Sequence, residues 1–143
     1  MTDAIAAYGT QLKVHDGATP GVFATVSEVK DITGPGYTRD TIDVTSHSSP
    51  DGWEEIIASF KRSGEMTYDL NFTPDDPTHS FDTGVFSLFD TGDRRRWQLV
   101  WPDDHGLEFE ALVIGLEPQS PVADARTASV TLKPSGAPTV LTP

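Results

Sequence analysis

The sequence predicts a mainly β protein, a β-sandwich or barrel-like pair of sheets with one flanking α-helix and a long inter-strand loop. Polar and apolar residues alternate in several segments, which is typical of half-buried strands. Turn signals such as Gly34-Pro35-Gly36 separate these segments, and one segment has helical spacing. We therefore expect about seven strands and one helix. The 143 residues fit a single domain that spans residues 1–143.

The first 36 residues are predicted to hold two strands. Residues 1–9 are expected to be a flexible terminus. A short strand is predicted at 11–15, and a longer one at 22–33, where Val and Thr are frequent. Gly34-Pro35-Gly36 then marks a turn.

The two clearest strands lie on either side of a long loop. Residues 37–45 alternate, and residues 65–73 place Met66, Tyr68, Leu70 and Phe72 on one face. Most β-hairpin loops have about 2 to 5 residues, so a loop over 46–63 is expected to be functional. Several of its residues are expected to contact another protein subunit, because an apolar patch left in water reduces solubility. They are Trp53, Glu54, Ile56, Ile57 and Phe60.

The second half contains the predicted helix. Phe81, Val85, Leu88 and Phe89 recur at helical spacing within 80–90. Thr78 or Ser80 is expected to cap its start, and Gly92 to end it.

Three further strands are expected at 97–101, 107–116 and 126–133. Gly115 is a plausible β-bulge within the second of them. The segment 134–143 is rich in Pro and Thr and is expected to be a flexible terminus.

Composition excludes several classes of protein. The chain carries 22 acidic and 10 basic residues, a net charge of −12, which argues against tight binding of nucleic acid. It has no cysteine, so disulfides and thiolate metal sites are excluded. No apolar run approaches the ~18 residues that span a bilayer, so no membrane partner is expected. The N-terminal residues lack the features of a signal peptide, and we expect synthesis in the cytoplasm.

One motif suggests catalysis. Asp-Thr-Gly occurs at 82–84 and 90–92, and the second copy resembles the active-site strand of an aspartic protease. That chemistry needs two carboxylates that share a proton, which a homodimer can supply through Asp90. However, Val113-Ile114-Gly115, which mimics a later strand of such proteases, follows too closely to leave room for a flap. The other interpretation places Asp90 at the end of a helix, and we predict no catalytic residue.

Metal and cofactor motifs are not found. His15, His47, His79 and His105 do not pair at metal-ligand spacing, and no phosphate-binding or dinucleotide-binding fingerprint is present. We predict no metal site and no cofactor.

Three consecutive arginines, Arg94, Arg95 and Arg96, stand out in this acidic chain. They fit charge pairing with acidic residues of a neighbouring subunit better than a phosphate patch. Simple exposure to solvent is the third interpretation.

An ordered set of segments resembles a known family. The segments are 30–36, 39–49, 52–57 and 61–72, and the resemblance covers about residues 22 to 116. The chain resembles the major tail tube proteins of long-tailed (siphovirus-like) bacteriophages and of phage-like gene-transfer agents.

The resemblance implies a structural protein. In that family six subunits form a ring, and their inner sheets join into one barrel around a lumen. Rings stack into a tube, and the long loop contacts the next ring. The tube conducts DNA, without specific binding, and the tape-measure protein, and terminator and tail-tip proteins are further partners. The resemblance also implies a location in the tail of a virion or phage-like particle, after synthesis in the cytoplasm of a bacterial host.

The family's bore is acidic, so we take Asp43, Glu65 and Asp69 as candidates for facing the lumen. An alternative is the Hcp-like tube of a contractile secretion system, which passes protein effectors. Less favoured alternatives are the dimeric aspartic protease and a monomeric ligand-binding sandwich.

Overall fold

The computed structural model describes residues 6–17 and 21–143. The described chain contains nine strands, one α-helix and a short 3-10 helix, η1. Their bounds are β1 Gln11–His15, β2 Phe23–Thr25, β3 Val29–Thr33, β4 Tyr37–Asp43, η1 Pro50–Gly52, β5 Ile56–Ser63, β6 Met66–Asn71, α1 Val85–Thr91, β7 Arg95–Val100, β8 Gly106–Gln119 and β9 Thr127–Leu141.

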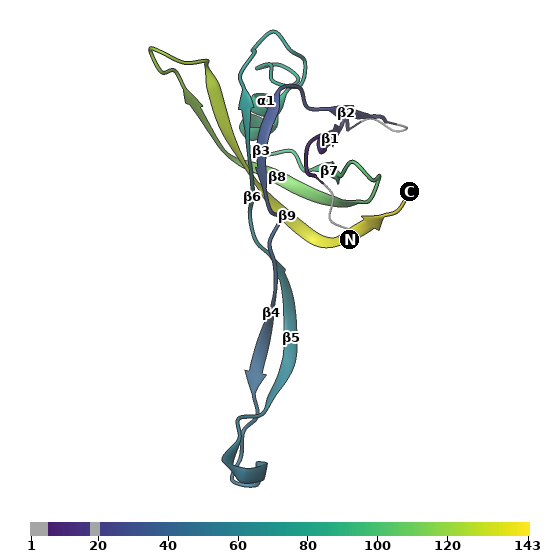
Figure 1. Cartoon of the computed structure of the whole chain (residues 1–143), viewed down its shortest axis with the longest axis vertical. Helices are drawn as coiled ribbons and strands as arrows, with labels where there is room; N and C mark the ends of the chain where they lie inside the picture. The colour runs from purple at the N-terminus through teal and green to yellow at the C-terminus, as the bar shows by residue number, and fades with distance from the viewer. Residues whose placement is uncertain (1–5, 18–20) are drawn as a thin grey trace.

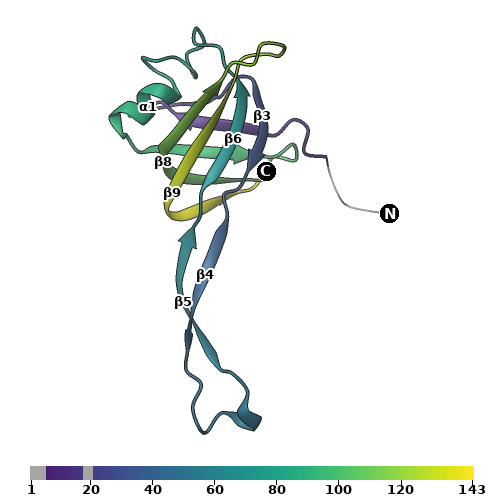
Figure 2. The ribbon, with the colours of Figure 1, turned by 90° about the vertical axis from the view of Figure 1, so that its left-hand side faces the viewer.

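Seven strands form one antiparallel sheet in the order β2-β1-β7-β8-β9-β6-β3. The long strands β8 and β9 contain two bulges, between Glu108 and Glu110 and between Val113 and Gly115. Bulges bend strands and increase their twist, so the sheet folds over on itself. The β1, β2 and β7 side then lies across the β3, β6 and β9 side, with α1 at one flank (Figures 1 and 2). The predicted mainly β fold, with a sandwich-like arrangement and one flanking helix, is confirmed.

The core lies between the two sides of this folded sheet. Met66, Tyr68 and Leu70 of β6 are fully buried, as their alternation predicts. From the opposite side Trp97 contributes a fully buried indole, with its ring centroid 6.1 Å from that of Tyr68. Together with α1, these seven strands form what we call the body of the molecule.

Strands β4 and β5 form a separate two-stranded sheet that projects from the body (Figures 1 and 2). We call residues 37–63 the arm. The prediction of a loop over 46–63 was wrong for its second half, because Ile56–Ser63 is strand β5 and pairs with β4. The pairing of β4 with β5 shifts between Arg39 and Thr41 of β4, so β5 contains a bulge that interrupts its alternation. For this reason the sequence pattern did not predict the strand.

The C-terminal segment also differs from its prediction. Instead of a loosely held tail from residue 134, β9 continues to Leu141, which lies opposite Gly106 of β8. The Pro-rich segment pairs with β8 across a register shift, at which Gly136 has a φ of 82°. Residues 1–5 lie outside the described residues.

Two smaller predictions are corrected. The strand expected over 22–33 is divided into β2 and β3 by a turn in which Glu28 has a φ of 60°. The helix begins at Val85, later than predicted, and Gly84 is its N-cap in place of Thr78 or Ser80. A Cβ atom at Gly84 would lie 2.4 Å from the Ser80 nitrogen, so the turn before the helix needs glycine here. Gly92 ends the helix in the left-handed conformation, as predicted.

Candidate assembly surfaces

The arm exposes an unusual amount of apolar surface. Trp53 is 73% exposed and Phe60 is 76% exposed, and Ile56 and Ile57 are each more than half exposed. These four residues were predicted as subunit contacts, and Glu54, the fifth, is exposed beside them. Three more exposed apolar residues of the arm were not predicted, and these are Tyr37, Ile42 and Val44. Apolar surface of this kind, on a hairpin without a second layer among the described residues, is typical of a contact site for protein, and the contact role of these residues stays a prediction.

The tip of the arm has a defined backbone. Val44 N–H donates to the Glu55 carbonyl at 2.9 Å, and Glu55 N–H donates to Thr45 Oγ1 at 2.8 Å. Ser49 is buried within the tip, where its Oγ accepts from Ser46 N–H at 2.9 Å. The tip therefore presents Trp53 from a hydrogen-bonded loop.

Glycines join the arm to the body. Gly64 N–H donates to the Gly36 carbonyl where the two chain segments cross. Gly34 has a φ of 93°, and a Cβ there would lie 2.9 Å from the Glu65 carbonyl oxygen. Lys133 Nζ donates to the Ser63 carbonyl at 2.8 Å and so ties the base of the arm to β9.

A second surface is the outer face of four neighbouring strand segments: β3, β6, β9 and residues 112–119 of β8. We call these segments the four-stranded layer. Their register places polar residues opposite one another on the face away from the core, for example Asp69 beside Ser129, whose Oγ donates to Asp69 Oδ1 at 2.6 Å. This polar face is made largely of hydroxyl groups and carries Thr33, Thr67, Asp69, Asn71, Thr127, Ser129, Thr131, Glu117 and Gln119.

The four-stranded layer has two unpaired edges. Strand β3 ends the sheet order, and β7 pairs with β8 only over Gly106–Ala111, so residues 112–119 have no strand partner on that side among the described residues. Unpaired edges attract other strands unless something covers them.

The predicted lumen candidates do not lie together. Asp69 lies on the polar face of β6, Glu65 lies in the turn between β5 and β6, and Asp43 ends β4 on the arm. Hydrogen bonds from Thr45 lower the pKa of Asp43 from its ordinary value. Lumen exposure of Asp43, Glu65 and Asp69 stays a prediction.

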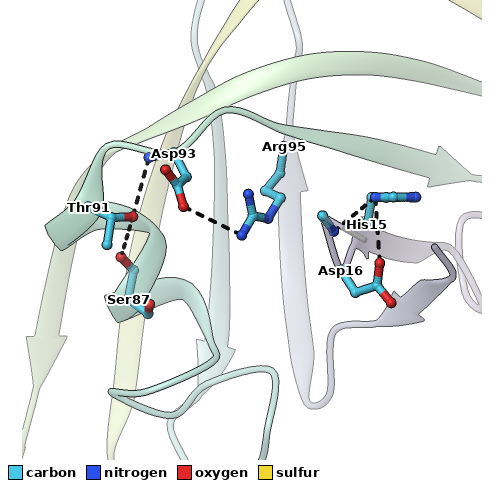
Figure 3. Close-up of polar contacts among 7 residues, drawn as sticks. His15, Asp16, Ser87, Thr91, Asp93 and Arg95 are labelled. Atoms are coloured by element: carbon cyan, nitrogen blue, oxygen red, sulfur yellow. Dashed lines mark hydrogen bonds and ion pairs between the residues drawn. The ribbon is translucent and has the colours of Figure 1, made fainter. Parts of the chain in front are cut away.

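The three arginines have partners within their own chain. Arg94 approaches Glu110 at 3.9 Å, and Arg95 approaches Asp93 at 3.5 Å (Figure 3). Arg96 lies 3.2 Å from His15 Nε2 and over the ring of Phe23. Their pairing with a neighbouring subunit stays a prediction.

The residues suggested for chemistry have structural roles. Asp90 and Thr91 lie in the last turn of α1, where Thr91 Oγ1 donates to the Ser87 carbonyl at 3.0 Å (Figure 3). His79 is fully buried and bridges two loops: its Nδ1 accepts from Thr73 N–H at 3.1 Å, and its Nε2 lies 2.6 Å from the Ser27 carbonyl. Within the described residues no three His, Asp or Glu side chains gather into a metal-binding group.

A folded sheet with a polar outer face, unpaired edges and a projecting apolar arm defines a protein that assembles with other copies. A family model described as lambda phage tail tube protein matches residues 8–141. The chain belongs to this family, and it is a structural subunit of a phage-type tail tube.

Solved structures share the fold at low sequence identity. The tail of an empty gene-transfer-agent particle, refined with C6 symmetry, is 18% identical with a TM-score of 0.77, covering 98% of this chain and 100% of that chain. The SPP1 tail tube is 10% identical with a TM-score of 0.71, covering 98% and 80%. The sheath-tube complex of an extracellular contractile injection system contains a chain that is 14% identical with a TM-score of 0.70, covering 98% and 93%.

A search of curated protein sequences found no match. None of the helical segments in the described residues has the length and apolar character needed to cross a membrane.

Proposed function

We propose that six copies of this subunit form a ring and that rings stack into a hollow tail tube. The six-fold symmetry of the gene-transfer-agent tail with the same fold supports this number. Pairing of β3 of one copy with the free edge of β8 in the next copy removes both exposed edges. Such a head-to-tail contact closes into a ring when its rotation fits.

The polar face of the four-stranded layer lines the passage in this proposal. Its hydroxyl groups, with Asp69 and Glu117 among them, give DNA no run of cations to bind. DNA therefore passes without specific binding. The tape-measure protein and the terminator and tail-tip proteins are the further partners in this proposal.

The arm carries the contact between rings. This assignment rests on the exposed apolar residues of the arm, above all Trp53 and Phe60. They lie on a hairpin that no other described element covers (Figure 1). Buried aromatic anchors dominate protein interfaces, so these side chains supply the contact energy when the next ring covers them.

The proposal includes no catalytic role. Asp90 lies at the end of a helix, which does not provide the strand that an aspartic protease needs. The matched family favours a phage-type tube over the protein-conducting tube of a contractile system, although tubes of both kinds share the fold.

Negative-stain electron microscopy of the purified chain over a range of concentrations tests the proposal. We expect rings or hollow tubes with six-fold end views. Deleting 48–59 is expected to leave folded subunits that do not stack. Normal tubes from the deletion variant would contradict the role of the arm, and monomers of the unmodified chain at every concentration would contradict assembly.

A further inference from the structure

A groove lies at the base of the arm, between the β4–β5 hairpin and the bend of β9. Its volume is about 770 Å³, within the range of sites that hold ligands or protruding side chains. Tyr37 of the arm and Pro134 and Pro138 of β9 give it an apolar part. Arg39, Lys61 and Arg62 also line it and make it basic.

Two of these cations form no ion pair with an acidic residue in the described part of the chain. Arg39 and Lys61 are directly opposite each other in the β4–β5 register, so both side chains lie on one face of the hairpin. Like charges in this position destabilise a strand pair. Arg62 forms an ion pair with Asp40 at 2.6 Å, whereas neither Arg39 nor Lys61 forms one with any described residue. The base of the arm is therefore suited to receive an anionic group from outside.

The opposite end of the same arm carries the complementary groups. Asp51, Glu54 and Glu55 surround Trp53 in the sequence, and all four residues are exposed. None of the three carboxylates forms an ion pair within the part of the chain that the structure describes. The tip thus combines an indole ring that needs an apolar surface with carboxylates that need cations.

We infer that the groove at the base of the arm binds the arm tip of a second copy. Trp53 of the second copy lies against Tyr37 and the β9 prolines, and Glu54 and Glu55 face Arg39 and Lys61. This inference rests on the proposed tube, because it specifies the contact between rings.

The geometry requires a second copy. Strand β4 has seven residues, which at roughly 3.4 Å each separate the base from the tip by more than about 20 Å, so the two ends of one arm do not meet. A contact between the tip of one copy and the base of the next is head-to-tail, and its repetition gives a filament when its rotation does not close. The same contact, repeated for every subunit of a ring, adds ring to ring in one direction.

Another acidic segment competes for the groove in principle. The turn after Trp101 contains Asp103 and Asp104. However, Trp101 is only 37% exposed, about half the value for Trp53, and Asp103 Oδ2 already lies 3.0 Å from His105 Nδ1. The arm tip is the better match, and cross-linking separates the two.

Charge reversal tests the inference in full-length protein. Glu54→Lys with Glu55→Lys, or Arg39→Glu with Lys61→Glu, is expected to raise the concentration needed for tubes roughly tenfold or more, because each places like charges together. The four substitutions combined are expected to recover most of that loss. Lys13→Glu reverses the charge of a lysine in strand β1 of the body. It is the matched control and is expected to leave the concentration needed for tubes unchanged. Unchanged tubes from both double variants would overturn the inference and leave the proposed function standing.

Engineered cysteines test it directly, because the chain has none of its own. Glu54→Cys combined with Ala137→Cys, in the lining of the groove, is expected to give a ladder of disulfide-linked multimers on a denaturing gel after oxidation of tubes. Glu54→Cys combined with Val122→Cys, on the loop between β8 and β9, is the control and is expected to stay monomeric on the gel. Tubes that yield no 54–137 cross-link overturn the inference, and a 54-to-103 cross-link in a Glu54→Cys, Asp103→Cys variant does so as well. If the unmodified chain forms neither rings nor tubes, both the proposed function and this inference fail.

Discussion

The body and the arm satisfy their apolar residues in different ways. In the body, β6 buries Met66, Tyr68 and Leu70 completely beneath the folded sheet. In the arm, Trp53 and Phe60 remain about three-quarters exposed, although the arm has regular strands and a hydrogen-bonded tip. Regular strands and backbone hydrogen bonds therefore do not show that the apolar side chains of a segment are buried within its own chain. The body has its core within one chain, and we propose that the arm gains its core from another copy.

The largest effect is expected in the body. Trp97→Ala removes a fully buried indole that packs near Tyr68, and we expect a loss of about 3–5 kcal/mol in the free energy of unfolding, measured by urea denaturation. A loss below about 1 kcal/mol would contradict the assignment of Trp97 to the core.

A smaller loss is expected at the loop bridge of His79. His79→Ala leaves the Ser27 carbonyl and Thr73 N–H without their partner, at a cost of about 1–3 kcal/mol. His47→Ala, on the exposed arm tip, is the matched control and is expected to change stability by less than about 0.5 kcal/mol. Equal losses of stability from His79→Ala and His47→Ala would contradict the claim that polar contacts in the body stabilise the subunit more than those at the arm tip.

A gain is expected where the core holds an unpaired hydroxyl group. Tyr68 Oη is buried and has no hydrogen-bond partner among the described residues, and this burial raises the pKa of Tyr68 far above its ordinary value. Tyr68→Phe keeps the ring and removes the hydroxyl group, so we expect stability to rise by about 1 kcal/mol in the same denaturation assay. A loss of stability would show that the hydroxyl group has a partner.

The smallest effect on stability is expected on the arm. Phe60→Ser removes an exposed ring and should change the unfolding free energy of the subunit by less than about 0.5 kcal/mol. The same substitution is expected to prevent stacking, as seen by electron microscopy. A Phe60→Ser variant that is less stable but still forms normal tubes would show that Phe60 belongs to the fold of the subunit and not to the contact between rings.

The sequence predicted the body better than the arm for a physical reason. The pattern of β6 repeats every two residues because one face meets the core, and Gly92 and Gly115 mark a helix end and a bulge as expected. Strand β5 was missed because its exposure and its bulge remove the alternation that burial imposes. The continuation of β9 was missed because Pro residues usually end strands, whereas here Pro134 pairs with Ala111 and Pro138 lies at a register shift.

The assembly surfaces were predicted only in part. Trp53 and Phe60 are identifiable from sequence, because large apolar residues are unusual in a segment expected to be a loop. The groove was not predictable, because it brings residues near 37 and 61 together with residues near 136. The polar face likewise depends on register, which placed Asp69 beside Ser129 and left Asp43 on the arm.

Amide hydrogen exchange of dilute subunits and of assembled tubes tests the central claim most directly, because it compares the two regions in one experiment. We predict that the amides of β4 and β5 exchange quickly in dilute protein and become strongly protected in tubes, whereas β6 is well protected in both states. Arm amides that exchange equally fast in dilute protein and in tubes would contradict the claim that another copy completes the arm.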